Sequence, residues 1–196
     1  HPLCPSNYYG YTKLCIENNL KWFSKLRTFC FGTLRYFNAA GYDIKNRIKG
    51  VENNPQNLIP KVMEVAAGVR ENIDIYGNDY DTKDGTGVRD YIHVNDLAMA
   101  HINTIDYICR ENKNLIINLG TGQGYSVLDI INKAKEVSKK SINYNVKNRR
   151  PGDSNIVVSQ SKLANKLINW KPEHSDLDTI IESTWAVYKN LKQLST

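Results

Sequence analysis

Two kinds of segment are missing from this 196-residue chain. No apolar run approaches the roughly 18 residues of a membrane-spanning helix, and the mean hydropathy is −0.50. No N-x-S/T acceptor for N-glycosylation occurs either. These absences argue against a membrane-spanning or secreted protein, and we expect a cytoplasmic protein with no membrane partner.

Paired cysteines are also missing. The cysteines occupy four irregularly spaced positions without a C-x-x-C motif, Cys4, Cys15, Cys30 and Cys109. This pattern predicts free buried thiols rather than disulfides or a metal site. His93 and His101 lack a carboxylate partner at metal-ligand spacing, so we expect no bound metal.

Charge of one sign is not concentrated anywhere. Lys and Arg number 26 against 20 Asp and Glu, a formal net charge of +6, and the densest basic cluster is "KNRR" at 147–150. Because acidic residues are interspersed throughout, we expect no nucleic-acid partner. The positive net charge matches an anionic small-molecule ligand better than a nucleic acid.

Apolar periodicity and turn residues predict alternating helices and strands, which indicates an α/β fold. Helices are expected at 9–25, 57–70, 97–110, 126–140, 161–168 and 176–191, and strands at 28–36, 73–77, 89–94, 115–120 and 141–146. Asn95 or Asp96 is expected to cap the third helix. Four aromatic residues are expected in the core, Trp22, Phe23, Phe29 and Phe31.

"LGTGQGYSVLDI" at 119–130 superficially matches a dinucleotide-binding glycine loop. Its glycines give G-x-G-x-G instead of G-x-G-x-x-G, and no acidic residue follows about twenty positions later. Ser126 and Asp129 instead form a capping-box pattern. We therefore predict a structural role for this loop.

"NYYGYTKL" at 7–14 places Tyr9 and Lys13 four positions apart near a helix start. Four residues bring two side chains to the same helix face. Tyr9 could be a general base whose phenolate is stabilised by the charge of Lys13, or the pair could simply belong to an amphipathic helix. The spacing alone leaves both interpretations open.

Six segments, read in order, carry a family resemblance. They are "NYYGYTK", "LRYFNAAG", "NNPQNLIPKVMEVAAG", "YGNDYDTKDGTGVRDYIHVNDLA", "INLGTGQGYSVLDII" and "RRPGD". Over nearly its whole length the sequence resembles the C-terminal portion of the UDP-glucose 4-epimerases, which are extended short-chain dehydrogenase/reductases. The most specific part is 76–97, because its "NDYDTKDGTG" insertion is usually absent from related dehydratases and decarboxylases.

The resemblance implies a division of the chain. Residues 1–40 would be a remnant of a Rossmann-like NAD-binding domain, and 41–196 would be mainly the smaller α/β UDP-sugar-binding domain, with 89–125 partly returning to the first. The family's NAD-binding glycine loop and catalytic Ser or Thr are not in this sequence. We therefore expect the 196-residue fragment alone to be inactive, and the full-length protein to be a homodimer.

The resemblance also implies an activity, the interconversion of UDP-glucose and UDP-galactose in galactose metabolism, with NAD as cofactor and a transient 4-keto sugar. Tyr9 would take the proton of the sugar 4-hydroxyl, and Lys13 would assist it and bond the nicotinamide ribose. The backbone of Phe37 would meet the nicotinamide amide, although Phe37 could equally be a core aromatic.

A UDP-hexose site follows from the same resemblance. The residues matched to diphosphate, sugar and uracil contacts are Asn38, Asn57, Leu58, Ile75, Tyr76, Arg89, Arg150 and Asp153. Forked guanidinium groups suit phosphate oxygens. Simpler roles stay open, since an Arg-Asp pair can be a surface ion pair and Asn and Asp favour turns.

Val157 matches the family position that walls the sugar pocket. A tyrosine there confines some members to glucose and galactose, whereas valine leaves space for an N-acetyl group. The resemblance therefore implies possible activity on N-acetylated UDP-hexosamines. Alternatively, Val157 is a core residue of a strand.

Two rival functions stay open. One is another nucleotide-sugar enzyme of the same superfamily, a 4,6-dehydratase or decarboxylase, whose distinguishing acid would lie upstream of His1. The other is a catalytically silent fragment that merely binds UDP-sugars or contributes structure. The strand at 28–36 favours the second, because its neighbours in a parallel sheet would be mostly absent.

Overall fold

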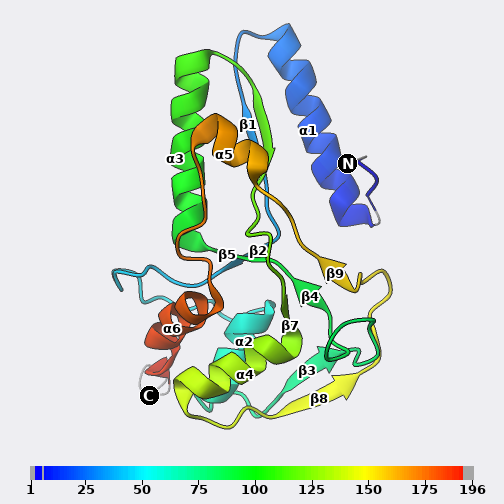
Figure 1. The fold of residues 1–196 in the computed structure, drawn as a ribbon, viewed down its shortest axis with the longest axis vertical. Helices are drawn as coiled ribbons and strands as arrows, with labels where there is room; N and C mark the ends of the chain where they lie inside the picture. Colours follow the sequence, from blue (N-terminus) through cyan, green and yellow to red (C-terminus); the bar gives the residue numbers. More distant parts are fainter. Residues whose placement is uncertain (1–2, 6, 192–196) are drawn as a thin grey trace.

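The computed structural model describes residues 3–5 and 7–191 (Figure 1). The helices are α1 (Tyr8–Leu26), α2 (Leu58–Ala66), α3 (Val94–Glu111), α4 (Val127–Ser138), α5 (Lys162–Ile168) and α6 (Leu177–Tyr188). The strands are β1 (Gly32–Arg35), β2 (Asn38–Ala40), β3 (Ile73–Tyr76), β4 (Val88–Arg89), β5 (Tyr91–His93), β6 (Leu115–Asn118), β7 (Tyr125–Ser126), β8 (Tyr144–Lys147) and β9 (Ile156–Val157). This alternation confirms the predicted α/β class.

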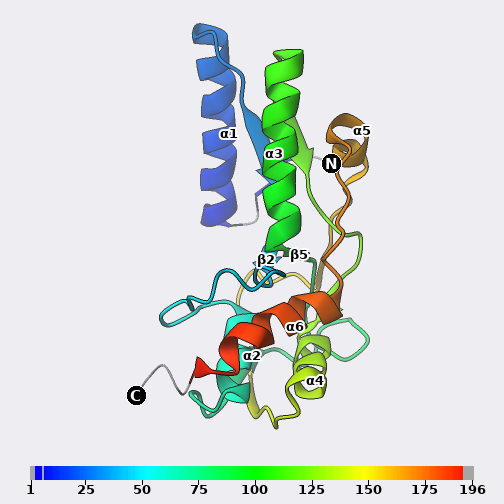
Figure 2. The same cartoon turned by 90° about the vertical axis from the view of Figure 1, so that its left-hand side faces the viewer.

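Helices α1, α3 and α5 lie at one end of the molecule, around the parallel pair of β1 and β6 (Figures 1 and 2). A small core joins α3, β6 and α5, formed by Ile92, Leu97, Ala100, Leu115, Ile117, Leu119, Ala164, Ile168 and Trp170. The burial of these apolar side chains fixes α3 and α5 against the sheet.

Helices α2, α4 and α6 pack together at the other end, beside the parallel pair of β3 and β8. The larger core lies here and includes Val62, Met63, Ile130, Ile131, Ile180 and Ile181, all fully buried. Between the two ends, β2 pairs with β5, and β4 pairs with β7 and β9. These short strands bring residues that are distant in sequence to the middle of the molecule.

Most predicted helix boundaries differ from the structure by one to four residues, and two of the differences have a clear cause. Helix α2 ends at Ala66 rather than at residue 70, because Gly68 adopts a φ of +72° and turns the chain. Helix α3 begins at Val94 with His93 as its cap, since the His93 ring accepts a hydrogen bond from the Asn95 amide. Asp96 does not cap the helix. Its buried carboxylate accepts hydrogen bonds from the 173–175 segment instead.

The expected aromatic core was largely wrong. Trp22, Phe23 and Phe29 are 63%, 58% and 39% exposed, and only Phe31 is buried. Within the described part of the chain, Glu17 is the one buried residue of α1. Leu14 and Leu20 of α1 are half-buried, but Trp22 and Phe23 do not join either core of the described chain.

An ion-pair cluster attaches α1 to β1. The Glu17 carboxylate accepts hydrogen bonds from Arg35 at 2.6 Å and from Lys21 at 2.9 Å. Burial raises the pKa of Glu17, but the two cations outweigh it and hold this pKa below its ordinary value. This cluster and the hydrogen bond that the Asn114 side chain donates to the Ser24 hydroxyl at 2.8 Å both join α1 to the described chain.

The cysteines are free, as predicted, but not buried, since Cys4 and Cys109 are exposed and the other two are half-buried. Among residues 3–5 and 7–191, no helix is long and apolar enough to cross a membrane. Within the same residues, no group of three or more His, Cys, Asp or Glu side chains is arranged to hold a metal ion.

Candidate functional site

A cavity of about 390 Å³ lies between the start of α2, the end of β3, strand β4 and the segment 150–153. We call it the charged cavity. Eight of the predicted substrate residues line it, namely Asn38, Asn57, Leu58, Ile75, Tyr76, Arg89, Arg150 and Asp153. Four cationic side chains against two acidic ones give its wall a formal positive excess. Such a wall attracts an anionic ligand.

Arg89 is held in place before any ligand binds. Its guanidinium donates to the carbonyls of Val88 and Ser154 at 2.9 and 2.8 Å. It also lies 3.8 Å from the Asp153 carboxylate. These contacts do not match the simpler alternative, in which Arg89 forms a surface ion pair with the adjacent Asp90. A fixed guanidinium loses little further freedom on binding an anion.

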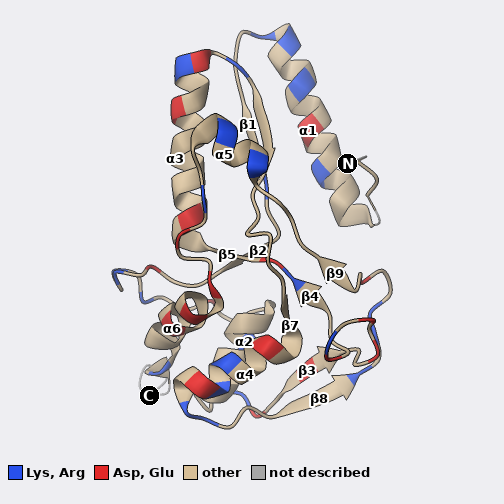
Figure 3. Ribbon diagram, in the orientation of Figure 1, with Lys and Arg blue, Asp and Glu red and all other residues tan. Residues whose placement is uncertain are grey.

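Arg150 and Arg149 are neighbours in sequence but have different partners. The Arg150 guanidinium lies 3.7 Å from the centre of the Tyr76 ring, within the charged cavity. Arg149 donates to Asp79 at 2.6 Å and lies over the Tyr80 ring. Figure 3 shows this basic segment and the acidic 77–88 loop in the same region. The loop is thereby fixed beside the cavity.

The 77–88 loop is also tied to α4. Asp84 accepts hydrogen bonds from Thr86 and from the Ser126 hydroxyl. Burial raises the pKa of Asp84, but these hydrogen bonds lower it by a larger amount, so this pKa lies below its ordinary value. The long insertion predicted as a loop is therefore an ordered wall next to the cavity.

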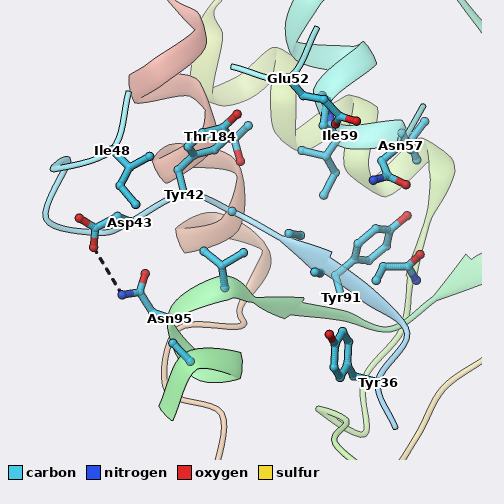
Figure 4. A pocket seen from close by; sticks show the side chains of 18 of the residues that line it. Tyr36, Tyr42, Asp43, Ile48, Glu52, Asn57, Ile59, Tyr91, Asn95 and Thr184 are labelled. Carbon is cyan, nitrogen blue, oxygen red and sulfur yellow. Dashed lines mark hydrogen bonds between the residues drawn. The ribbon is translucent and has the colours of Figure 1, made fainter. Parts of the chain in front are cut away.

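A larger cavity of about 730 Å³ adjoins the first (Figure 4). The two share the residues Asn38, Asn57, Leu58 and Tyr91, and Phe37 lines the larger one. Phe37 is 46% exposed, so it is not the ordinary core aromatic that the sequence left open. Burial raises the pKa of Tyr91 to about 12, which keeps its hydroxyl neutral between the two cavities.

Sequence reasoning missed Asp90, which organises the strands behind the cavity. Its fully buried carboxylate accepts hydrogen bonds from the Thr121 amide and hydroxyl and from the Ser159 amide. Its carbonyl accepts from the Asn38 side chain at 2.9 Å. Burial raises the pKa of Asp90. The sequence signal for a buried carboxylate at this position was an acidic residue followed directly by the apolar run "YIHV".

Tyr9 and Lys13 lie on one face of α1, as their spacing predicts, with the Lys13 ammonium 5.0 Å from the centre of the Tyr9 ring. Tyr9 is 70% exposed, and neither residue lines the two cavities. Val157 pairs with Arg89 in the β4–β9 ladder and is half-buried, but it does not line either cavity.

The glycine loop at 119–124 does not fit a dinucleotide phosphate. A Cβ on Gly120 would lie 2.5 Å from the Ser159 carbonyl, and one on Gly124 would lie 2.5 Å from the Val88 side chain. Gly120 and Gly124 therefore let the loop pack closely against Ser159 and Val88, which agrees with the predicted structural role. The capping box of Ser126 and Asp129 is confirmed. Tyr9, Lys13 and Phe37, the residues that the family resemblance matches to the nicotinamide end of NAD, lie outside this loop.

Three comparisons relate this chain to known proteins. The family model described as GDP-mannose 4,6 dehydratase matches residues 1–184. A UDP-glucose 4-epimerase of Lacticaseibacillus casei is 40% identical over 190 residues, covering 96% of this chain and 57% of that protein. The chain thus spans a little more than half the length of such relatives.

Two solved structures share its fold. The UDP-glucose 4-epimerase of Bifidobacterium longum, in complex with NAD+ and UDP, is 38% identical with a TM-score of 0.84, covering 96% of this chain and 56% of that one. The UDP-Glc/GlcNAc 4-epimerase of Campylobacter jejuni is 37% identical with a TM-score of 0.76, covering 96% and 57%.

Proposed function

Because this chain belongs to the GDP-mannose 4,6 dehydratase family and, within it, to the UDP-glucose 4-epimerases, we propose that its protein interconverts UDP-glucose and UDP-galactose by inverting the sugar at C4. The observation that carries the proposal is the charged cavity, where eight predicted substrate residues meet. The same cavity makes a silent structural role a poorer account of these residues.

The charged cavity would bind the UDP part of the substrate. Arg89 and Arg150 would contact the diphosphate, and the Asn57 side chain, which makes no capping bond, would donate to it. Tyr76 and Ile75 would border the uracil, and Asp153 would accept from a ribose hydroxyl. The sugar would then extend past Asn38 and Leu58 toward the larger cavity.

The chemistry would take place at Tyr9 and Lys13. NAD, bound beside them, would supply a reversible hydride acceptor for the sugar C4. Tyr9 would remove the proton of the 4-hydroxyl, and the adjacent Lys13 charge would stabilise the phenolate. Since neither side chain lines a cavity, the mechanism requires the sugar to extend beyond the cavity walls to reach α1.

Several wider features belong to the same proposal. Residues 1–40 would form part of the NAD-binding domain, 41–196 would form mainly the substrate domain, and 89–125 would partly return to the first. The exposed apolar face of α1 supports a homodimer, because association would bury it. Four free cysteines support a cytoplasmic location.

Activity on N-acetylated UDP-hexosamines is the finer part of the proposal. Val157 lines neither cavity, but the family resemblance matches it to the position where a tyrosine would narrow the sugar pocket, and its side chain is short. The Campylobacter jejuni relative, named a UDP-Glc/GlcNAc 4-epimerase, supports it by analogy.

The test is product analysis after incubating the full-length protein with UDP-galactose and NAD. We expect UDP-glucose to form without net production of NADH. A 4-keto-6-deoxy product would instead identify a dehydratase. If UDP-galactose is recovered unchanged although the protein binds UDP, the protein is a silent binding protein.

A further inference from the structure

Lys61 lies on α2, one turn after Asn57, and its half-buried side chain lines the charged cavity. Within residues 3–5 and 7–191, no hydrogen bond or ion pair engages its ammonium. Partial burial of an uncompensated charge is unfavourable. The position therefore calls for a partner that the described chain does not supply.

The other cations of this cavity already have partners. Arg70 pairs with Glu64 at 2.7 Å. Arg89 donates to two carbonyls and faces Asp153, and the Arg150 guanidinium lies over an aromatic ring. Lys61 thus differs from the rest of the wall, because its positive charge is not committed to protein groups.

The place of Lys61 near the start of α2 makes its unpaired positive charge more unusual. The start of a helix carries a partial positive charge, so acidic side chains are favoured there and cations are not. Lys61 is the fourth residue of α2, and no acidic residue occupies the first turn. The Asn57 side chain makes no capping bond, and the first amides of a helix have no intrahelical acceptor. All these groups attract one negative charge placed between them.

We infer that Lys61 is a third cationic ligand of the substrate diphosphate, together with Arg89 and Arg150. The inference rests on the proposed function and adds a residue to its binding site. Two acidic side chains, Asp74 and Asp153, line the same cavity and repel the phosphates. A third cation offsets that repulsion and favours a nucleoside diphosphate over a nucleoside.

The test compares binding of UDP and of uridine by calorimetry in the full-length protein. Lys61→Met keeps the apolar stem and removes the charge, and we expect it to weaken UDP binding roughly 10- to 100-fold. Uridine affinity should stay unchanged, because uridine lacks the phosphates. Lys61→Arg should restore most of the UDP affinity.

Lys140→Met is the matched control. Lys140 is exposed after the end of α4 and lines neither cavity, yet its loss changes the net charge by the same amount. UDP affinity should stay at the wild-type value in this variant. An equal loss in both variants would mean a general charge effect and would overturn the role of Lys61.

Two further results would overturn the inference. Wild-type UDP affinity in Lys61→Met would remove Lys61 from the site, and an equal loss of uridine affinity would mean that Lys61 only supports the fold. If the wild-type protein converts UDP-galactose while Lys61→Met binds UDP normally, only this inference fails. If the wild-type protein binds no UDP, the proposed function fails with it.

Discussion

Replacing Asp90 with alanine should destabilise the protein strongly, although Asp90 does not line a cavity. Its carboxylate accepts from the amides of Thr121 and Ser159 at 3.1 and 3.2 Å and from the Thr121 hydroxyl at 2.8 Å. The hydroxyl has a second acceptor in the Gln123 carbonyl, so alanine leaves two amides unpaired. Each unpaired buried donor costs about 1–3 kcal/mol.

Relief of carboxylate desolvation offsets part of this cost, since burial raises the pKa of Asp90. We expect a net loss of about 2–4 kcal/mol in the free energy of unfolding. Asp90→Asn keeps one oxygen acceptor and should lose about half as much. Urea unfolding of the full-length protein measures both values.

Asp81→Ala is the control, because Asp81 is exposed on the 77–88 loop. A change below about 0.5 kcal/mol is expected there. A similarly small change in Asp90→Ala would refute the reasoning, because the two amides would then have found water or another acceptor.

The pH dependence of the Asp90 effect has a definite sign. A pKa raised in the folded state adds stability below the ordinary value of 3.8, and this contribution is lost as the pH rises through the folded pKa. The stability difference between the wild type and Asp90→Ala should therefore narrow from pH 4 to pH 7. A difference that widens over this range would contradict the assigned shift.

Three other outcomes follow from the proposed site and from the core. Tyr9→Phe should lower turnover roughly 10²- to 10⁴-fold with little change in UDP affinity, measured by steady-state kinetics, and near-normal turnover would exclude Tyr9 as the base. Val157→Tyr should lower kcat/KM for the N-acetylated sugars much more than for UDP-galactose, whereas a wild type inert toward the N-acetylated sugars would end that idea. Burial lowers the pKa of His93 below its usual 6.5, so the free energy of unfolding should fall as the pH drops below about 6.5. A His93→Gln variant should flatten this slope, and an unchanged slope would assign it to other groups.

Local chemistry made parts of the fold predictable. The Ser126 and Asp129 capping box needs only residues three apart, and it was identified from the sequence. The short strand predicted at "IDIYG" is likewise confirmed as β3, and its side chains alternate between buried and exposed. The predictions failed where contacts with residues distant in sequence determine the structure. The apolar stripe of α1 predicted a buried face, but periodicity cannot tell which partner covers a helix.

The candidate site was likewise predictable from the sequence only in part. Eight of the residues matched through the family resemblance converge on the charged cavity, although nothing in their spacing shows that Asn57 and Asp153 would meet. Tyr9, Lys13, Phe37 and Val157 do not line it. Asp90 was missed because its partners are 31 and 69 positions away. Lys61 was missed because a lysine on a helix ordinarily indicates a solvated face.

The different partners of Arg149 and Arg150 have a consequence for how long a ligand stays bound. The Arg149 side chain binds Asp79 of the 77–88 loop, and the Arg150 side chain lines the charged cavity, where the proposed nucleotide would bind. Any shift of the loop must therefore move the backbone that carries Arg150. If the proposed nucleotide site is correct, changes in the loop would alter the nucleotide's dissociation rate without replacing a group that touches it, so residence time could be tuned independently of the chemistry.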